Sequence, residues 1–255
     1  MSRQLLNAVH AFLSISILAS PGCLSLDRES TLPYAHAIYD PSGGEIPLPS
    51  DLVVDEEAGH VELPTDDPDL TPADVAFRGY LNSLEAWPTT ISSSVRFNTP
   101  VDPATVTVDT VQVWRWGDEP REVDGVTPEL DDDGTTAAFD APEGGWDPGA
   151  TYVAFVRGGR DGVRTVEGAE VGPDTAFYFL RLDEPLDAYV NHRAFPGATR
   201  EERLEVAAAL EEIRVELDPY LDFLERDAPP KKRLARSEVA ALWAFSITDQ
   251  VELAM

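Results

Sequence analysis

The stretch from Ser93 to Leu182 sets the strongest limit on how this chain folds. Short runs rich in valine, threonine and aromatic residues alternate there with clusters of glycine, proline and aspartate. This pattern is typical of strands joined by turns, and its regular spacing favours a small antiparallel β-sandwich. The sequence therefore predicts a mainly β fold with this stretch at its centre.

Strands are expected at residues 94–98, 110–116, 123–130, 135–140, 151–157 and 176–181. Three aspartates and a glycine at 131–134 predict a hairpin turn, because aspartate tolerates turn geometry and glycine supplies a positive φ.

Two tryptophans, Trp114 and Trp116, share one face of the strand expected at 110–116, because side chains alternate along a strand. The valines of the other face are expected to point into the sandwich, so the tryptophans point outward. Outward tryptophans can pack against another segment, such as the region of Trp87 or the C-terminal helix, contact a partner protein, or stack on a sugar. Packing within the chain is the expected outcome.

The segments on either side of the sandwich have their own patterns. Residues 46–88 predict an extended segment with short β pieces, because its prolines cannot donate to a sheet ladder. A short strand at 60–64 is expected to close a hairpin around residues 57–59. A short helix is expected at 73–85.

An amphipathic helix and a strand are expected at the C-terminal end. Thr199 and Glu202 form a capping box, after which apolar residues recur at steps of three and four. Pro219 predicts a kink or a break in this helix. The basic run at 231–233 is expected to be a solvated loop, and residues 239–248 predict a buried strand.

The net charge limits the possible partners. The chain has 47 aspartates and glutamates against 19 lysines and arginines, a net charge of −28. Such a charge repels nucleic-acid phosphates and anionic membrane surfaces, so electrostatic binding to either is disfavoured. The single cysteine, Cys23, rules out an internal disulfide framework and any metal site built from several cysteines.

The first residues have the features of an export signal. Arg3 precedes an apolar stretch at 5–19, which is too short and too polar for a transmembrane helix of about 20 residues. Gly22 directly before Cys23 resembles a bacterial lipobox, although Ser20 stands where that motif usually has leucine. The resemblance implies cleavage before Cys23, whose sulfur then carries a lipid that anchors the protein in a membrane. A plain secretory signal is the alternative.

Two segments of the expected sandwich resemble bacterial Ig-like domains of the S-layer type. Residues 97–106, Phe-Asn-Thr-Pro-Val-Asp-Pro-Ala-Thr-Val, are similar to the opening of that family, and residues 146–156 are similar to its Gly-x-x-Tyr strand. The likeness spans residues 90–182. It implies an Ig-like antiparallel β-sandwich and a binding or scaffolding role at the cell surface.

A wider resemblance, over residues 40–250, is to the N-terminal region of bacterial virulence-factor lipases. Residues 46–52, Ile-Pro-Leu-Pro-Ser-Asp-Leu, are similar to its start, and the helix followed by residues 239–248 is similar to its end. In that family an α/β-hydrolase domain follows and carries the catalytic serine. This chain ends at Met255, where that domain would begin, so the resemblance supplies no catalytic residue.

The sequence motifs do not predict an enzyme. The chain has no Gly-x-Ser-x-Gly elbow and no histidine pair at zinc-site spacing, so serine-hydrolase and zinc chemistry lack their residues. The aspartates at 131–133 and those at 66, 67 and 69 could give oxygen ligands to Ca²⁺, but neither group has calcium-loop spacing, and turn formation is the expected role. We therefore expect a protein without catalytic residues, cofactor or metal.

These observations divide the chain into five expected segments. They are a signal peptide (1–22), a tether (23–45), an extended β segment (46–88), an Ig-like sandwich (89–183) and a helix–strand unit (184–255). The expected function is that of a non-catalytic lipoprotein at the outer membrane or cell surface, with a binding or scaffolding role toward a surface protein.

Two alternatives stay open. One is an accessory part of a secreted lipase-like hydrolase whose catalytic domain is absent from this chain. Exposed apolar side chains on the strand at 239–248 would indicate it. The other is a glycan-binding module that uses Trp114 and Trp116.

Overall fold

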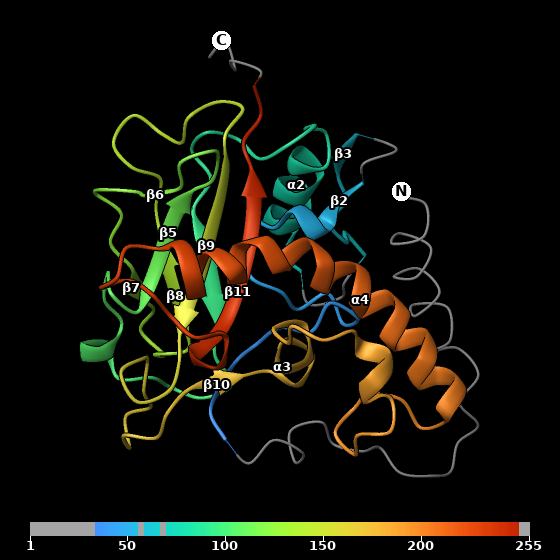
Figure 1. Ribbon diagram of the computed structural model, residues 1–255. Coiled ribbons are helices and arrows are strands. Elements are labelled where there is room, and N and C mark those ends of the chain that lie inside the picture. The colour runs from blue at the N-terminus through green and yellow to red at the C-terminus, as the bar shows by residue number, and fades with distance from the viewer. Residues whose placement is uncertain (1–33, 56–58, 67–69, 250–255) are drawn as a thin grey trace.

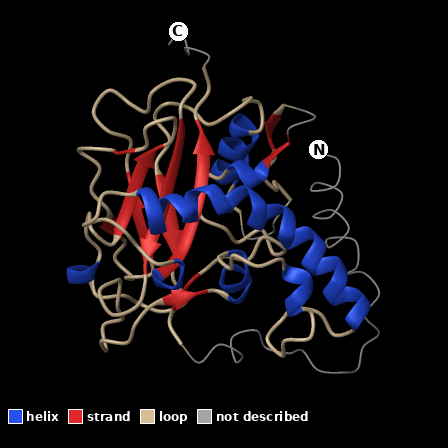
Figure 2. Cartoon of the chain, viewed as in Figure 1, coloured by secondary structure: helices blue, strands red, loops and turns tan. Residues whose placement is uncertain are grey.

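Two antiparallel sheets form the centre of the computed structural model, which describes residues 34–55, 59–66 and 70–249 (Figures 1 and 2). The larger sheet has the strand order β11-β9-β5-β6, and the smaller has the order β4-β8-β7. The strands are β4 (Ser93–Arg96), β5 (Val111–Arg115), β6 (Arg121–Glu122), β7 (Glu129–Leu130), β8 (Thr136–Phe139), β9 (Thr151–Arg157) and β11 (Val239–Ser246). The prediction of a mainly β fold is confirmed.

Side chains on the inner face of the larger sheet fill the space between the two sheets. Trp243 pairs in register with Ala154 of β9, which pairs with Val113 of β5, so these three side chains share one face. The Trp243 indole N–H donates to the Ser93 hydroxyl of β4 at 3.1 Å, and its ring stacks on Phe139 of β8 with 6.4 Å between centroids. The last strand therefore contributes its largest side chain to the core of the sandwich.

The outer face of the larger sheet is covered by helix α4 (Arg200–Asp222) and the π-helical turn η6 (Phe223–Asp227), which cross it in Figure 1. Trp114 lies edge-on to Phe223 with 5.2 Å between centroids, and Trp116 lies edge-on to Tyr220 with 4.7 Å. Both tryptophans therefore pack within the chain, as expected. The glycan-binding alternative gains no support from this packing, because both tryptophans contact aromatic side chains of the helix.

Two of the expected strands are wrong. Of the strand expected at 123–130, only residues 129–130 are a strand, namely β7. Residues 123–128 form a loop that passes from one sheet to the other, because β6 pairs with β5 and β7 pairs with β8. Residues 176–181 belong instead to helix α3 (Thr175–Leu180), where Asp174 caps the first turn by accepting the Ala176 N–H at 3.3 Å. A short apolar run suits either state, and the cap decides between them. The other four strands agree with prediction to within two residues.

Residues 34–45 belong to the folded body, although the sequence places them in a tether. Strand β1 (His36–Ala37) pairs in parallel with β10 (Gly172–Pro173), and Tyr39 is fully buried beside Phe177. A two-residue strand whose partner lies far along the chain leaves no local pattern, which explains the difference. Cys23 and the leader lie outside the described residues.

The flanking elements largely agree with prediction. Strands β2 (Val54–Asp55) and β3 (His60–Val61) form the expected hairpin, and helix α2 (Pro72–Leu81) follows. Helix α4 begins after the capping box and continues through Pro219 without a break, since the irregular turn η6 comes four residues later. The remaining 3₁₀ turns are η3 (Asp51–Val53), η4 (Pro103–Thr105), η5 (Leu186–Tyr189) and η7 (Arg236–Glu238).

Asp51, at the start of η3, holds the end of the last strand. Its Oδ1 accepts the Ser246 N–H at 2.7 Å, and its Oδ2 accepts the Ser246 hydroxyl at 2.8 Å. Burial raises the pKa of the Asp51 carboxyl, and the two hydrogen bonds from Ser246 oppose that rise without cancelling it. The folded state therefore favours the protonated form of this carboxyl.

Replacing Asp51 by asparagine should change how stability depends on pH. Because the pKa of Asp51 is higher in the folded than in the unfolded chain, its favourable contribution is complete at low pH. That contribution is lost as the pH rises through the folded pKa. We expect the difference in melting temperature, wild type minus Asp51→Asn, to decrease as the pH rises above about 4, the ordinary pKa of an aspartate. Thermal unfolding of both proteins in the same buffers measures it, and a constant or rising difference would contradict the burial argument.

Candidate functional site

The strongest candidate for a binding site lies where the N-terminal half of α4 extends past the sheets and meets η5 (Figure 1). The helix begins here because the Thr199 hydroxyl accepts the Glu202 N–H at 3.1 Å and the Glu202 carboxylate accepts the Thr199 N–H at 2.9 Å. Arg203 then joins the helix to the preceding loop by donating from Nε to the Gly197 carbonyl at 2.8 Å. This end of α4 is therefore fixed in place.

An ion pair holds η5 against α4. The Arg214 guanidinium donates to the Glu211 carboxylate from Nε at 2.9 Å and from Nη2 at 2.8 Å. The same carboxylate accepts the Leu186 N–H of η5 at 3.0 Å, and Arg214 Nη1 donates to the Leu182 carbonyl at 3.3 Å. The hydrogen bond from Arg214 lowers the pKa of Glu211, so this carboxylate stays ionised at neutral pH.

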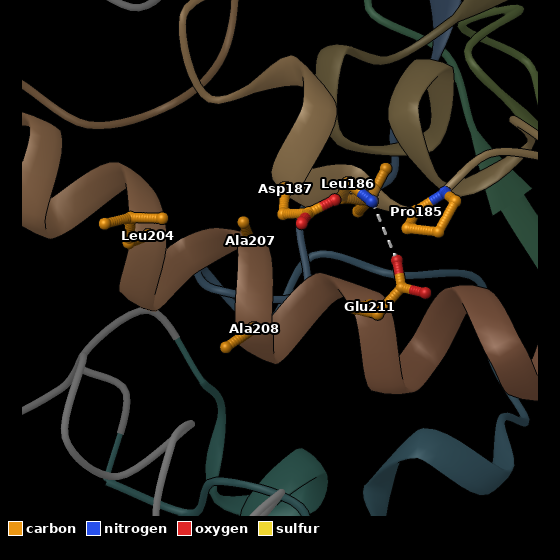
Figure 3. A pocket seen from close by; sticks show the side chains of 7 residues that line it. All are labelled: Pro185, Leu186, Asp187, Leu204, Ala207, Ala208 and Glu211. Atoms are coloured by element: carbon orange, nitrogen blue, oxygen red, sulfur yellow. Dashed lines mark hydrogen bonds between the residues drawn. The ribbon is translucent and has the colours of Figure 1, made fainter.

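A pocket of about 280 Å³ lies between η5 and α4 (Figure 3). Leu186 and Ala207 are buried at its base, whereas Leu204 and Ala208 are exposed. Apart from two carboxylates its lining is apolar. We call this site the α4 groove and define it by Pro185, Leu186, Asp187, Leu204, Ala207, Ala208 and Glu211.

The apolar lining continues along α4 as an exposed stripe formed by Leu204, Ala208 and Val215. These residues are four and seven positions apart, which places them on one side of a helix. Leu204 is 38% exposed and Val215 is 55% exposed. The helical repeat puts acidic side chains along the solvent side of this stripe, at Glu201, Glu205, Glu212 and Glu216.

The candidates taken from the sequence do not gather at this groove. Cys23 and residues 67–69 lie outside the described part of the chain. Asp131 accepts the N–H groups of Thr135 and Thr136 at 2.7 and 3.0 Å, which is the turn role expected of it. Among the described residues, no group of three or more histidine, cysteine, aspartate or glutamate side chains is placed to hold a metal ion. No helix in that part of the chain has the length and apolar character needed to cross a membrane.

One residue of the basic run has a structural role that the sequence does not reveal. Lys232 Nζ lies 2.9 Å from Asp109 Oδ1 and 3.1 Å from Glu122 Oε1. It therefore joins the segment after η6 to the turn before β5 and to β6. The groove also escapes sequence analysis, because Pro185 and Leu186 reach it from a separate segment. Its only local signal is the presence of exposed Leu204 and Val215 beside the acidic side of α4.

No protein-family model and no curated protein sequence matches the chain. Part of the chain is similar to the solved structure of surface layer protein SbsC, domains 1-6, with 23% identity over 33% of this chain and 12% of that one, and a TM-score of 0.26. The N-terminal part of the bacterial S-layer protein SbsC is similar with 20% identity over 39% of this chain and 24% of that one, and a TM-score of 0.26. E. coli alpha-2-macroglobulin is similar with 18% identity over 33% of this chain and 5% of that one, and a TM-score of 0.26. The chain spans less than a quarter of each of these structures, and such local similarity assigns it no function.

Proposed function

We propose that the protein is a non-catalytic lipoprotein of the cell envelope that binds a partner protein through the α4 groove. The observation that carries the binding role is the groove itself, an open apolar pocket that continues into an exposed apolar stripe. Contiguous apolar surface on a folded protein usually marks an interaction site. The ion pair between Glu211 and Arg214 supports the proposal further, because a wall that is already fixed loses little conformational entropy on binding.

The location in the envelope is proposed from the leader. The apolar stretch at 5–19 and the Gly22–Cys23 pair support export and lipid attachment at Cys23. The resemblance of residues 90–182 to S-layer-type Ig-like domains supports a place at the cell surface. The anchor and the groove are separate features, so each can be tested without the other.

Replacing Cys23 by serine should convert a detergent-soluble protein into an aqueous one. When expressed with its leader in a bacterial host, the wild type is expected to gain the mass of its lipid and to enter the detergent phase. The acyl chains anchor it because each buried methylene contributes about 0.8 kcal/mol. Intact mass and phase partitioning measure both properties. A Ser20→Leu variant, which restores the usual lipobox leucine, should behave like the wild type.

The outcome against the lipid anchor is equally clear. If the wild type and Cys23→Ser are both aqueous and both lack the leader, the protein is a released factor and the anchor is wrong.

The accessory-lipase alternative requires exposed apolar side chains on the last strand. Leu242, Trp243 and Phe245 are each at most 1% exposed. They face the sandwich or the covering helix, and the alternative gains no support from β11.

A further inference from the structure

We propose that the α4 groove receives a cationic amphipathic helix of a partner protein. The inference rests on the binding role proposed above and names the chemistry of the partner. It follows from three properties of the groove: the length of its apolar stripe, the side on which its acidic residues lie, and the hydrogen-bond partners of the nearby arginines.

The stripe has the dimensions of a short helix. From Leu204 to Val215 the chain advances eleven positions, which is about 16 Å along the axis or about three turns. Pro185 and Leu186 form the facing wall of the pocket, and the N–H of Leu186 donates to Glu211, so the stripe is recessed beside Ala207 and Glu211 (Figure 3). Val215 is not part of the pocket lining. A helix of three turns that presents apolar residues at every third or fourth position fits such a surface.

The acidic side chains lie where the polar edge of such a helix would come. With 100° of rotation per residue, Leu204, Ala208 and Val215 fall within about 40° of one another on the helical wheel, and Glu201, Glu205 and Glu212 follow in the next 60° or so toward solvent. Asp187 lies on the opposite wall. A bound helix would therefore place its apolar face between carboxylates on both sides, which selects lysine and arginine at its borders.

Two of the three arginines of α4, Arg203 and Arg214, bond to groups other than those carboxylates. Arg203 donates to the backbone carbonyls of Gly197 and Val190, at 2.8 and 3.3 Å. Arg214 donates to the Glu211 carboxylate. The groove therefore keeps its negative character within a chain of net charge −28, and attraction of a cationic partner also speeds its association.

The test uses the purified protein and a synthetic probe. The probe is a fluorescein-labelled helical peptide of about five turns with leucine on one face and lysine on the other. Fluorescence anisotropy of the label measures its binding. The wild type is expected to bind it, with a Kd that rises as salt is added. A peptide with the same leucines but glutamate in place of lysine should not bind.

A matched pair of variants separates the groove from general charge attraction. Ala208→Arg places a long cation in the middle of the stripe and should raise the Kd at least about tenfold. Val166→Arg makes the same change of charge at a residue that is 59% exposed in the loop bridged by Arg164 and Glu170, away from the groove. It should leave the Kd within about twofold of the wild type. Equal melting temperatures show that both variants are folded, as expected for exposed positions.

Two results would overturn the proposal. One is failure of the wild type to bind the lysine peptide. The other is an equal loss of binding in the two arginine variants, which would mean that the peptide follows net charge alone. Neither result depends on lipid at Cys23, so failure here is distinct from failure of the proposed envelope location.

Discussion

Replacing Trp243 by alanine should lower the free energy of unfolding by about 3–5 kcal/mol, the range for truncation of a buried tryptophan. The side chain is 1% exposed and lies between the two sheets, where it stacks on Phe139. Alanine would leave a cavity there and would also remove the partner of the buried Ser93 hydroxyl. Chemical denaturation of the two proteins measures the difference, provided that the free energy of unfolding depends on denaturant concentration with the same slope in both.

Two further variants identify the source of this effect. Trp243→Phe keeps most of the apolar contact but loses the indole N–H, so it should cost about 1–2 kcal/mol through the unpaired Ser93. Val215→Ala alters only the exposed stripe of α4 and should change stability by less than about 0.5 kcal/mol. A loss for Trp243→Ala no larger than that for Val215→Ala would contradict the position of β11 in the sandwich.

The elements that the sequence predicts well are those whose signal is local. Strand β9 is observed at the residues expected, because a run of valine and aromatic residues follows a proline–glycine turn. Helix α4 begins at the capping box of Thr199 and Glu202, a local pattern of two residues three positions apart. Alternation along β5 also gives the outward direction of Trp114 and Trp116, and the apolar face of α4 supplies the surface that covers them.

The elements that escape prediction depend on contacts between distant segments. Strand β1 exists only through its parallel pairing with β10, and neither has enough residues to form a pattern. Helix α3 has a run of apolar residues that strands also use, and the cap at Asp174 favours the helix.

The candidate site shows the same division. The sequence predicts an amphipathic helix after the capping box, and the structure shows it as α4. It does not predict the groove, because Leu186 belongs to a separate segment, which the hydrogen bond from its N–H to Glu211 joins to α4. The lipid site at Cys23 is a property of the leader motif, and it stays a prediction.

The junction between α4 and β11 depends on a second group with a large expected effect, Arg236 of η7. Its guanidinium contacts Asp218 at 2.8 Å, donates to Asp222, and lies 3.9 Å from Glu225 Oε2. The Arg236 side chain is only 10% exposed, whereas those of Asp218 and Asp222 are 39% and 33% exposed. One buried cation therefore holds the carboxylates at the end of the helix to the turn that starts the last strand.

Replacing Arg236 by methionine should lower the free energy of unfolding by about 2–3 kcal/mol. Removing one partner of a fully buried ion pair costs about 3–5 kcal/mol, and the partial exposure of the two aspartates reduces that figure through solvent screening. Arg226→Met is the matched control, because Arg226 also contacts Asp222 at 2.8 Å but has a side chain that is 60% exposed. Its loss should be about 0.5 kcal/mol or less and should disappear at high salt, while most of the Arg236 effect persists. Urea unfolding at low and high salt measures both losses. Equal losses would mean that burial adds nothing at Arg236, and that the junction is held by packing of the helix on the sheet alone.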